Sequence, residues 1–243
     1  MAPINLIALS PSTYARDLDS DLTEHLQWYG PGKLHPTHLG DALGEGGRYT
    51  VVHKLDHSNH SLSWLVRDGA TRAWRRIDVV HAAPDVSAHI RDRVEALLRE
   101  REKRGSRDRQ GPDADADARG TPLSTFFHRG PNGTHLCIVF PLNGAVNCFR
   151  WGLRRRDGAE MNEAWFVRQC ARLRAATGVG AAALAPASVH DVTEREMLAI
   201  LGWPRVIEVT EELRERTFGG AGSGCIIRPD QVPRFLVLRP DPI

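Results

Sequence analysis

Histidines are the residues of this chain that could most readily bind a metal ion or transfer a proton, and the sequence contains eleven of them. Five lie close together along the chain, at His35, His38, His53, His57 and His60. Metal sites need ligands at short, characteristic spacings, and these positions match no such pattern. We therefore expect structural histidines scattered through the fold and no metal site.

Four cysteines are the other reactive groups, at Cys137, Cys148, Cys170 and Cys225. They are widely spaced and form no CxxC pair, which favours buried free thiols in a reducing compartment over disulfides or metal ligands.

Charge and hydropathy narrow the class of protein and of partner. The 32 basic and 30 acidic residues nearly cancel, giving a net charge of +2, so no nucleic-acid partner is expected. The longest mainly apolar stretch, residues 178–189, is too short and too rich in alanine to cross a bilayer. Residues 1–9 lack the basic region of a secretory signal. These features predict a cytoplasmic or nuclear protein with no membrane partner.

The first half of the chain predicts an extended segment, three strands and a helix. Proline and glycine recur in residues 1–40, where only residues 18–28 favour a short helix. Residues rich in β-branched side chains predict strands at 48–55, 61–67 and 74–80. Residues 84–104 have the apolar period of a helix, and the charge-dense run at 99–120 is expected to be a mobile loop.

The second half predicts two further strands followed by helices. The strands are expected at residues 126–127 and 136–140, the second being a continuous apolar run typical of a buried strand. Residues 161–176 favour a helix. A second helix, residues 193–201, begins with a capping box of Thr193 and Glu196 and ends at a Gly-Trp-Pro sequence.

Three separated blocks of sequence carry a family resemblance. They are residues 34–41 (LHPTHLGD) with 47–49, 54–55 and 64–68; residues 128–140 (HRGPNGTHLCIVF); and residues 194–204 (EREMLAILGWP) with 232–237 (VPRFLV). In this order they resemble the start of the small lobe, the fourth and fifth strands, and the characteristic insert of serine/arginine-protein-kinase-like serine/threonine kinases. The chain is identified as a degenerate, truncated relative of that family.

The resemblance implies an α+β fold with a protein-kinase-like small lobe, consisting of an antiparallel five-stranded sheet and one helix, followed by an incomplete helical large-lobe remnant. The expected divisions are an extended lead-in (1–40), the small lobe (41–143), and the remnant with the family insert (144–243).

The same resemblance locates the nucleotide-binding positions at Leu55, Asp56, Ser58, Ser63 and Asp78. A kinase requires a glycine-rich turn over the phosphates and a strand lysine that neutralises them. Asp56 and Ser58 match the first two glycines, Ser63 matches the valine that covers adenine, and Asp78 matches the lysine. A carboxylate near the triphosphate predicts weak nucleotide binding.

The helix glutamate that normally holds the lysine matches Arg93, with Glu95 two residues away. Asp78 and Arg93 would then form a charge-swapped ion pair, or they are unrelated surface charges. Arg75 or Arg76 could replace the lysine as a cation, but we expect this to require a change of strand register.

The resemblance assigns the hinge to Phe140, Pro141 and Leu142 and assigns no catalytic residue or metal ligand. The family's His-x-Asp loop and its later Asn have no counterpart. His190-Asp191 matches the insert better than that loop.

Three functions remain open at this point. The first is an inactive pseudokinase acting through an unknown protein partner. The second is a residual serine/threonine kinase, and of the three functions only this one would require ATP and Mg²⁺. Because the first and third functions involve no catalysis, the sequence leaves open whether the protein is an enzyme. The third is a truncated, non-functional product, in which exposure of Trp165 and Phe166 would cause self-association.

Overall fold

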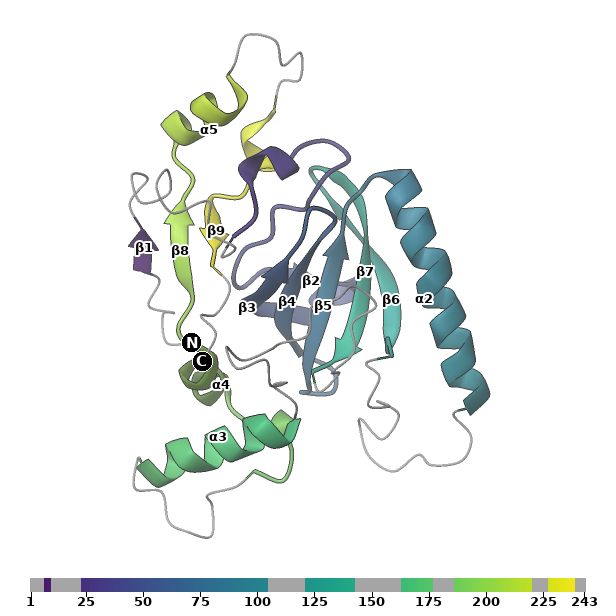
Figure 1. The fold of residues 1–243 in the computed structure, drawn as a ribbon, viewed down its shortest axis with the longest axis vertical. Coiled ribbons are helices and arrows are strands. Elements are labelled where there is room, and N and C mark those ends of the chain that lie inside the picture. The colour runs from purple at the N-terminus through teal and green to yellow at the C-terminus, as the bar shows by residue number, and fades with distance from the viewer. Residues whose placement is uncertain are drawn as a thin grey trace.

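The computed structural model describes residues 7–9, 23–104, 121–142, 163–176, 186–219 and 227–238. Its centre is a sheet of six strands in the order β2-β3-β4-β5-β7-β6, in which every neighbouring pair is antiparallel. Figure 1 shows helix α2 beside this sheet and a small second sheet on its other side. The predicted α+β class is confirmed.

The strands of the large sheet correspond closely to the sequence pattern. They are β2 (Ala42–Leu43), β3 (Tyr49–His57), β4 (Ser61–Asp68), β5 (Trp74–Val80), β6 (Ser124–Gly130) and β7 (Gly133–Pro141). The prediction of five strands misses β2, because two residues are too short to show a period of two.

Helix α2 (Pro84–Arg104) connects β5 to the second half of the sheet. Its apolar side chains Ile90 and Val94 are buried. The prediction of a loop from residue 99 is wrong for residues 99–104, which are helical. Arg99 pairs with Glu95 one turn earlier at 3.1 Å, so opposite charges at this spacing support the last turns. Residues 105–120 lie outside the described part of the chain.

The two faces of the large sheet bury different clusters. Alternation places Ile77 and Val79 of β5 on one face, in the same cluster as residues of the small sheet. The opposite face has two clusters. Val80 and Ile138 pack with α2 near one end, and Leu65 packs with two later helices near the other.

The small sheet joins distant parts of the sequence. Strand β1 (Ile7–Leu9) is parallel to β8 (Arg205–Glu208), which is antiparallel to β9 (Phe235–Val237). Helix α5 (Glu211–Phe218) follows β8 and buries Leu213 in the cluster shared by both sheets. These short elements were not predicted.

Helices α3 (Glu163–Ala176) and α4 (Glu194–Leu201) lie together at the end of the sheet away from α5 (Figure 1). The predicted capping box at the start of α4 is present, with Thr193 accepting from the Glu196 backbone. The expected exposure of Trp165 and Phe166 is wrong: they are 5% and 0% exposed, because α3 packs its apolar face against the sheet cluster that contains Leu65.

The N-terminal strap, which we define as residues 23–41, runs along the sheet as mostly irregular chain. The short helix predicted at 18–28 is present only as a 3-10 turn at Leu26–Trp28, and residues 18–22 lie outside the described part. Cys137 and Cys170 are buried free thiols, whereas Cys148 and Cys225 are not described. No helix in the described ranges is long and apolar enough to span a membrane.

Candidate functional site

The turn between β3 and β4, which the resemblance places over the nucleotide phosphates, is closed by its own side chains. The Ser58 hydroxyl accepts the backbone N–H groups of His60 (3.2 Å) and Ser61 (3.0 Å). Asp56 accepts the N–H of His57 at 2.9 Å, and Leu55 is buried below the turn. The N–H groups of His60 and Ser61 are thus directed at a hydroxyl within the turn.

Ser63, Asp78, Arg76 and Phe140 form a compact cluster on the face that also carries α2. Ser63 donates to Asp78 Oδ1 at 2.7 Å from the neighbouring strand. Arg76 Nε lies 3.1 Å from the same oxygen, and Arg76 Nη2 donates to Asp78 Oδ2 at 3.3 Å. The Arg76 guanidinium also stacks 4.1 Å from the centroid of the Phe140 ring. Asp78 and Arg76 are only 4% and 7% exposed.

The prediction that Arg76 needs a change of register to reach the lysine position is wrong. Side chains two residues apart on a strand share a face, so Arg76 and Asp78 lie on the same side of β5 in the observed register. Arg75 lies on the opposite face by the same rule.

The charge-swapped pair between Asp78 and Arg93 is not formed. Asp78 pairs with Arg76, and the Arg93 side chain is exposed on α2 because Ile90 and Val94 occupy the buried stripe. Glu95, the alternative position, contacts Arg91 and Arg99 on its own helix. Neither alternative therefore connects α2 to Asp78.

The predicted hinge residues follow one another at the end of β7, where Phe140, Pro141 and Leu142 are all buried. His190 lies elsewhere, at the contact between β5 and the segment before α4. Its Nδ1 accepts the Trp74 backbone N–H at 3.1 Å, and its carbonyl accepts from Arg67 at 3.1 Å. These bonds give His190 a structural role.

At the positions where the resemblance places the nucleotide, Asp78 is paired with Arg76 of the same strand. A phosphate-neutralising lysine contributes about 4 kcal/mol for a charge pair 4 Å apart at an effective dielectric constant of about 20. Here Asp78 and Arg76 together carry no net charge, so that attraction is missing. Within the described ranges, no three His, Cys, Asp or Glu side chains are arranged to hold a metal ion.

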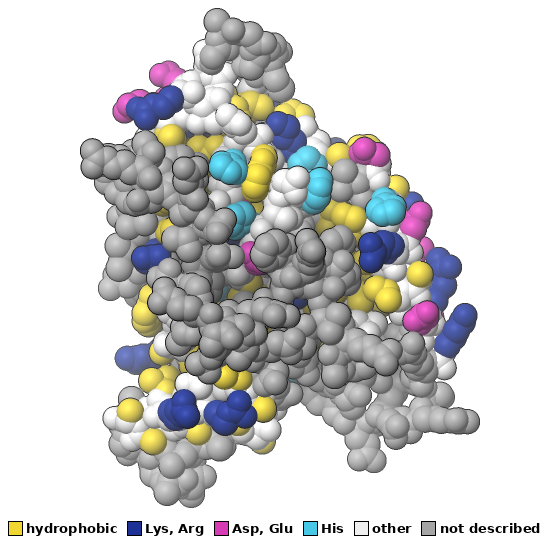
Figure 2. Space-filling model, viewed as in Figure 1, with side chains coloured by type: hydrophobic (Ala, Val, Ile, Leu, Met, Phe, Trp, Pro, Cys, Tyr) yellow, Lys and Arg dark blue, Asp and Glu magenta, His cyan; other side chains and the backbone are white. Residues whose placement is uncertain are grey.

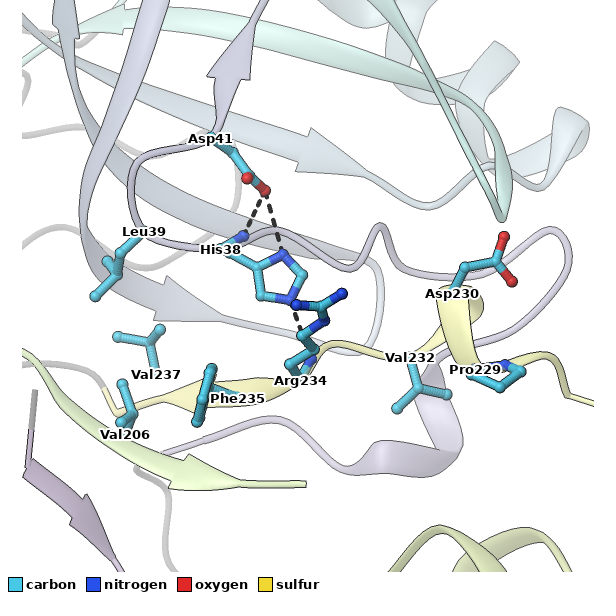
Figure 3. Close-up of a pocket in the computed structure, with 10 residues that line it drawn as sticks. All are labelled: His38, Leu39, Asp41, Val206, Pro229, Asp230, Val232, Arg234, Phe235 and Val237. Carbon is cyan, nitrogen blue, oxygen red and sulfur yellow. Dashed lines mark hydrogen bonds and ion pairs between the residues drawn. The ribbon is translucent and has the colours of Figure 1, made fainter. Parts of the chain in front are cut away.

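A pocket of about 550 Å³, which sequence reasoning missed, lies on the other face of the sheet. Figure 3 shows it between the strap and β9, with His38 and Asp41 at one wall and Val206 and Phe235 below. His38 donates its backbone N–H to Asp41 Oδ2 (2.7 Å), and His38 Nε2 accepts the backbone N–H of Arg234 (3.0 Å). Contacts between residues so far apart in sequence leave no local pattern.

Electrostatics keep the Asp41 carboxyl ionised beside this pocket. Burial raises the pKa of Asp41, but hydrogen bonds from the His38 ring and backbone outweigh it and lower the pKa overall. His38 is therefore held between a carboxylate of its own strap and the backbone of Arg234, immediately before β9, and these bonds connect the two walls of the pocket.

Comparison with known proteins shows that part of this chain is similar in sequence to protein kinases. Protein kinase dsk1 of Schizosaccharomyces pombe is 31% identical over 121 residues, covering 50% of this chain and 21% of that protein. SRSF protein kinase 3 of Homo sapiens is 28% identical over 126 residues (52% and 21%), and serine/threonine-protein kinase SKY1 of Saccharomyces cerevisiae is 28% identical over 126 residues (50% and 16%). The chain spans about a fifth of the length of these relatives.

A crystal structure of a kinase domain aligns with 44% of this chain and 27% of its own, at 12% identity and a TM-score of 0.33. No protein-family model matches the chain. The predicted resemblance is confirmed by the sequence relatives: over about half of its length, this protein-kinase-like chain is similar to SR-protein kinases.

Proposed function

We propose that this chain is a protein-kinase-like binding module that transfers no phosphate and acts through contacts with a protein partner. The observation that carries the proposal is the buried Arg76–Asp78 pair, to which Ser63 donates and in which Arg76 stacks on Phe140. These side chains pair with one another at the positions where the resemblance places the nucleotide.

Rearranging this cluster for ATP would be costly. For Arg76 to reach a phosphate, its bonds to Asp78 must break, which leaves a buried carboxylate with only Ser63 as a described partner. Breaking a buried pair in this way costs roughly 3–5 kcal/mol. A residual ATP- and Mg²⁺-dependent serine/threonine kinase, the alternative suggested by the named relatives, would have to recover this energy from binding.

A thermal melt of the purified chain with and without 5 mM Mg·ATP tests the proposal. We expect a cooperative transition that nucleotide shifts by less than about 1 °C. If ATP bound with a Kd of about 50 μM, this concentration would be a hundredfold excess and would add about 2.7 kcal/mol, or about 5–10 °C for a chain of this size. Such a shift would contradict the proposal, as would the absence of any cooperative transition.

A matched variant tests whether the Arg76–Asp78 pair is what prevents nucleotide binding. Arg76→Ala combined with Asp78→Lys removes the self-paired cluster and supplies a cation to the site. If this variant gains a nucleotide-dependent shift, the cluster is what excludes ATP. If it remains insensitive, the closed turn at Asp56 and Ser58 also blocks binding.

Protein contacts need exposed surface, and the described residues offer two large apolar side chains. Phe127 on β6 is 56% exposed, and Trp203 after α4 is 45% exposed. We propose these as contact points for the partner or for self-association, in place of Trp165 and Phe166. The buried free thiols Cys137 and Cys170 fit the cytoplasmic or nuclear location that we propose.

A further inference from the structure

Histidine side chains gather on one part of the surface, separate from the proposed nucleotide positions. Figure 2 shows several of them together on the upper part of one face. The largely buried ring of His35 in the strap lies 4.9 Å from the ring of His128 on β6 and 4.9 Å from that of the buried His135 on β7. The strap, β6 and β7 therefore each contribute one imidazole ring to this cluster.

Two nitrogens in this group are buried without a hydrogen-bond partner. His135 Nδ1 lies 2.9 Å from the Val80 carbonyl, which can only accept, so this nitrogen carries the proton and Nε2 is bare. Within the described structure, His135 Nε2 and His35 Nδ1 are both buried and lack a partner. The two residues are 0% and 6% exposed, so a proton added to either nitrogen places a charge in a buried site.

The fit of His35 against the β6–β7 turn is close. A Cβ atom at Gly130 would lie 2.3 Å from the His35 ring, so only glycine allows the strap to approach here. Beside this contact, Gly32 donates its N–H to the Asn132 carbonyl at 2.7 Å, and Asn132 Nδ2 donates to the Leu34 carbonyl at 2.6 Å. The imidazole contacts and these bonds hold the strap on the turn.

Other ionisable groups surround the rings on every side. They are His38 and Asp41 in the strap, His128 on β6, and His81 after β5, which itself faces His60, Lys33 and Asp85. Asp41 favours a proton on His35, but His38, His128 and His135 oppose it. Charging one ring thus makes charging the next harder while the strap remains in place.

We propose that His35, His128 and His135 form an acid-operated latch. The neutral rings hold the strap on the β6–β7 turn, and protonation releases it. Release also removes His38, Leu39 and Asp41 from the 550 Å³ pocket, because these residues belong to the same strap. Binding at that pocket would therefore depend on pH.

The direction of the effect follows from proton linkage. Burial, with repulsion from His135 and His128, lowers the pKa of His35 from 6.5 to about 3. Burial, with repulsion from His128 and His81, lowers that of His135 to about 4 despite the bond to Val80. Burial also lowers the pKa of His128. The released strap binds more protons than the held one, so the latch is fully closed above pH 6.5 and weakens as pH falls toward 4.

Hydrogen exchange of the full chain, followed by mass spectrometry at pH 7.5 and 5.5 and corrected for intrinsic exchange rates, measures the release. Each ring with an open-state pKa of 6.5 raises the opening constant about tenfold over this range, so His35 and His135 together give about a hundredfold. We expect that change in peptides covering residues 30–41, with residues 61–80 staying protected. Equal loss in both segments would overturn the latch and leave only a global acid transition, to which buried His53 would contribute.

Variants that cannot titrate complete the test. His35→Phe keeps a ring, and His135→Asn keeps an N–H near the Val80 carbonyl. The double variant should lose the roughly hundredfold change that His35 and His135 supply and keep only the contribution of His128. Each single variant should retain about tenfold of that change, which tests the proposal even if the double variant does not fold. His89→Gln on the exposed face of α2 should behave as the unmodified chain. Persistence of the hundredfold change in the ring variants would disprove the proposal.

Discussion

Replacing Lys54 with methionine is expected to destabilise the fold by about 3–5 kcal/mol, because it leaves a buried carboxylate unpaired. Lys54 on β3 is 0% exposed and forms an ion pair with Glu24 of the strap, which is 2% exposed. Thr23 donates to Glu24 at 2.9 Å, and Tyr29 donates its hydroxyl to the other carboxylate oxygen. Without Lys54, these two hydrogen bonds would be left to stabilise a buried carboxylate whose charge the lysine no longer balances.

Urea unfolding followed by circular dichroism measures this loss. Lys54→Met combined with Glu24→Gln removes both charges and should recover most of the stability, since an uncharged pair carries a much smaller desolvation cost. The matched control is Arg216→Met, which breaks an exposed pair with Glu212 on α5 and should cost less than about 1 kcal/mol. If Lys54→Met cost no more than the control, the pair would not be buried as described.

The large sheet was predictable because its strands have local patterns. Residues 74–80 were predicted as a strand and form β5 with those bounds. The helix prediction at 84–104 also has the bounds of α2, because Ile90, Val94, Leu97 and Leu98 follow the helical period, although the overlapping loop prediction was wrong for residues 99–104. For β5 and α2, the pattern of residues within the element itself is enough to predict the structure.

Partnerships between distant residues were not predictable in the same way. The pairing of Glu24 with Lys54 and the parallel pairing of β1 with β8 depend on the tertiary fold and leave no periodic signal. The nucleotide-site prediction placed Ser63 and Asp78, which do lie together, but neither of its alternatives for Asp78, a pair with Arg93 or an unrelated surface charge, included the buried pair with Arg76. The rotation of α2 about its axis decides which side chains face the sheet, and it turns Arg93 to solvent.

The prediction that Trp165 would be exposed failed for a physical reason that also identifies what holds α3 and α4. It assumed that these helices need a complete large lobe to cover their apolar faces. Instead the end of the sheet covers them, through a cluster that includes Leu65, Trp74 and Leu142. Helices α3 and α4 and the large sheet therefore share a core, and truncating Trp74 within it should destabilise both parts.

Trp74→Ala is accordingly expected to cost about 3–5 kcal/mol, as for other buried aromatic residues that are truncated to alanine. Trp74 is 0% exposed, and its indole Nε1 donates to the Val192 carbonyl at 2.8 Å. The Arg67 guanidinium covers the ring at 4.7 Å from its centroid. Removing the side chain opens a cavity, leaves the Val192 carbonyl without this donor, and exposes the faces of α3 and α4.

Two further substitutions separate these contributions in urea titrations. Trp74→Phe keeps most of the ring but not the N–H, so its cost, about 1–3 kcal/mol, reports the unsatisfied Val192 carbonyl. Trp203→Ala removes an indole that is 45% exposed and should change stability by less than about 0.5 kcal/mol. Hydrogen exchange in residues 189–201 should rise in Trp74→Ala before it rises in β4, because α4 is anchored through this side chain. Equal costs for the two alanine variants would mean that α3 and α4 do not dock on the sheet through Trp74.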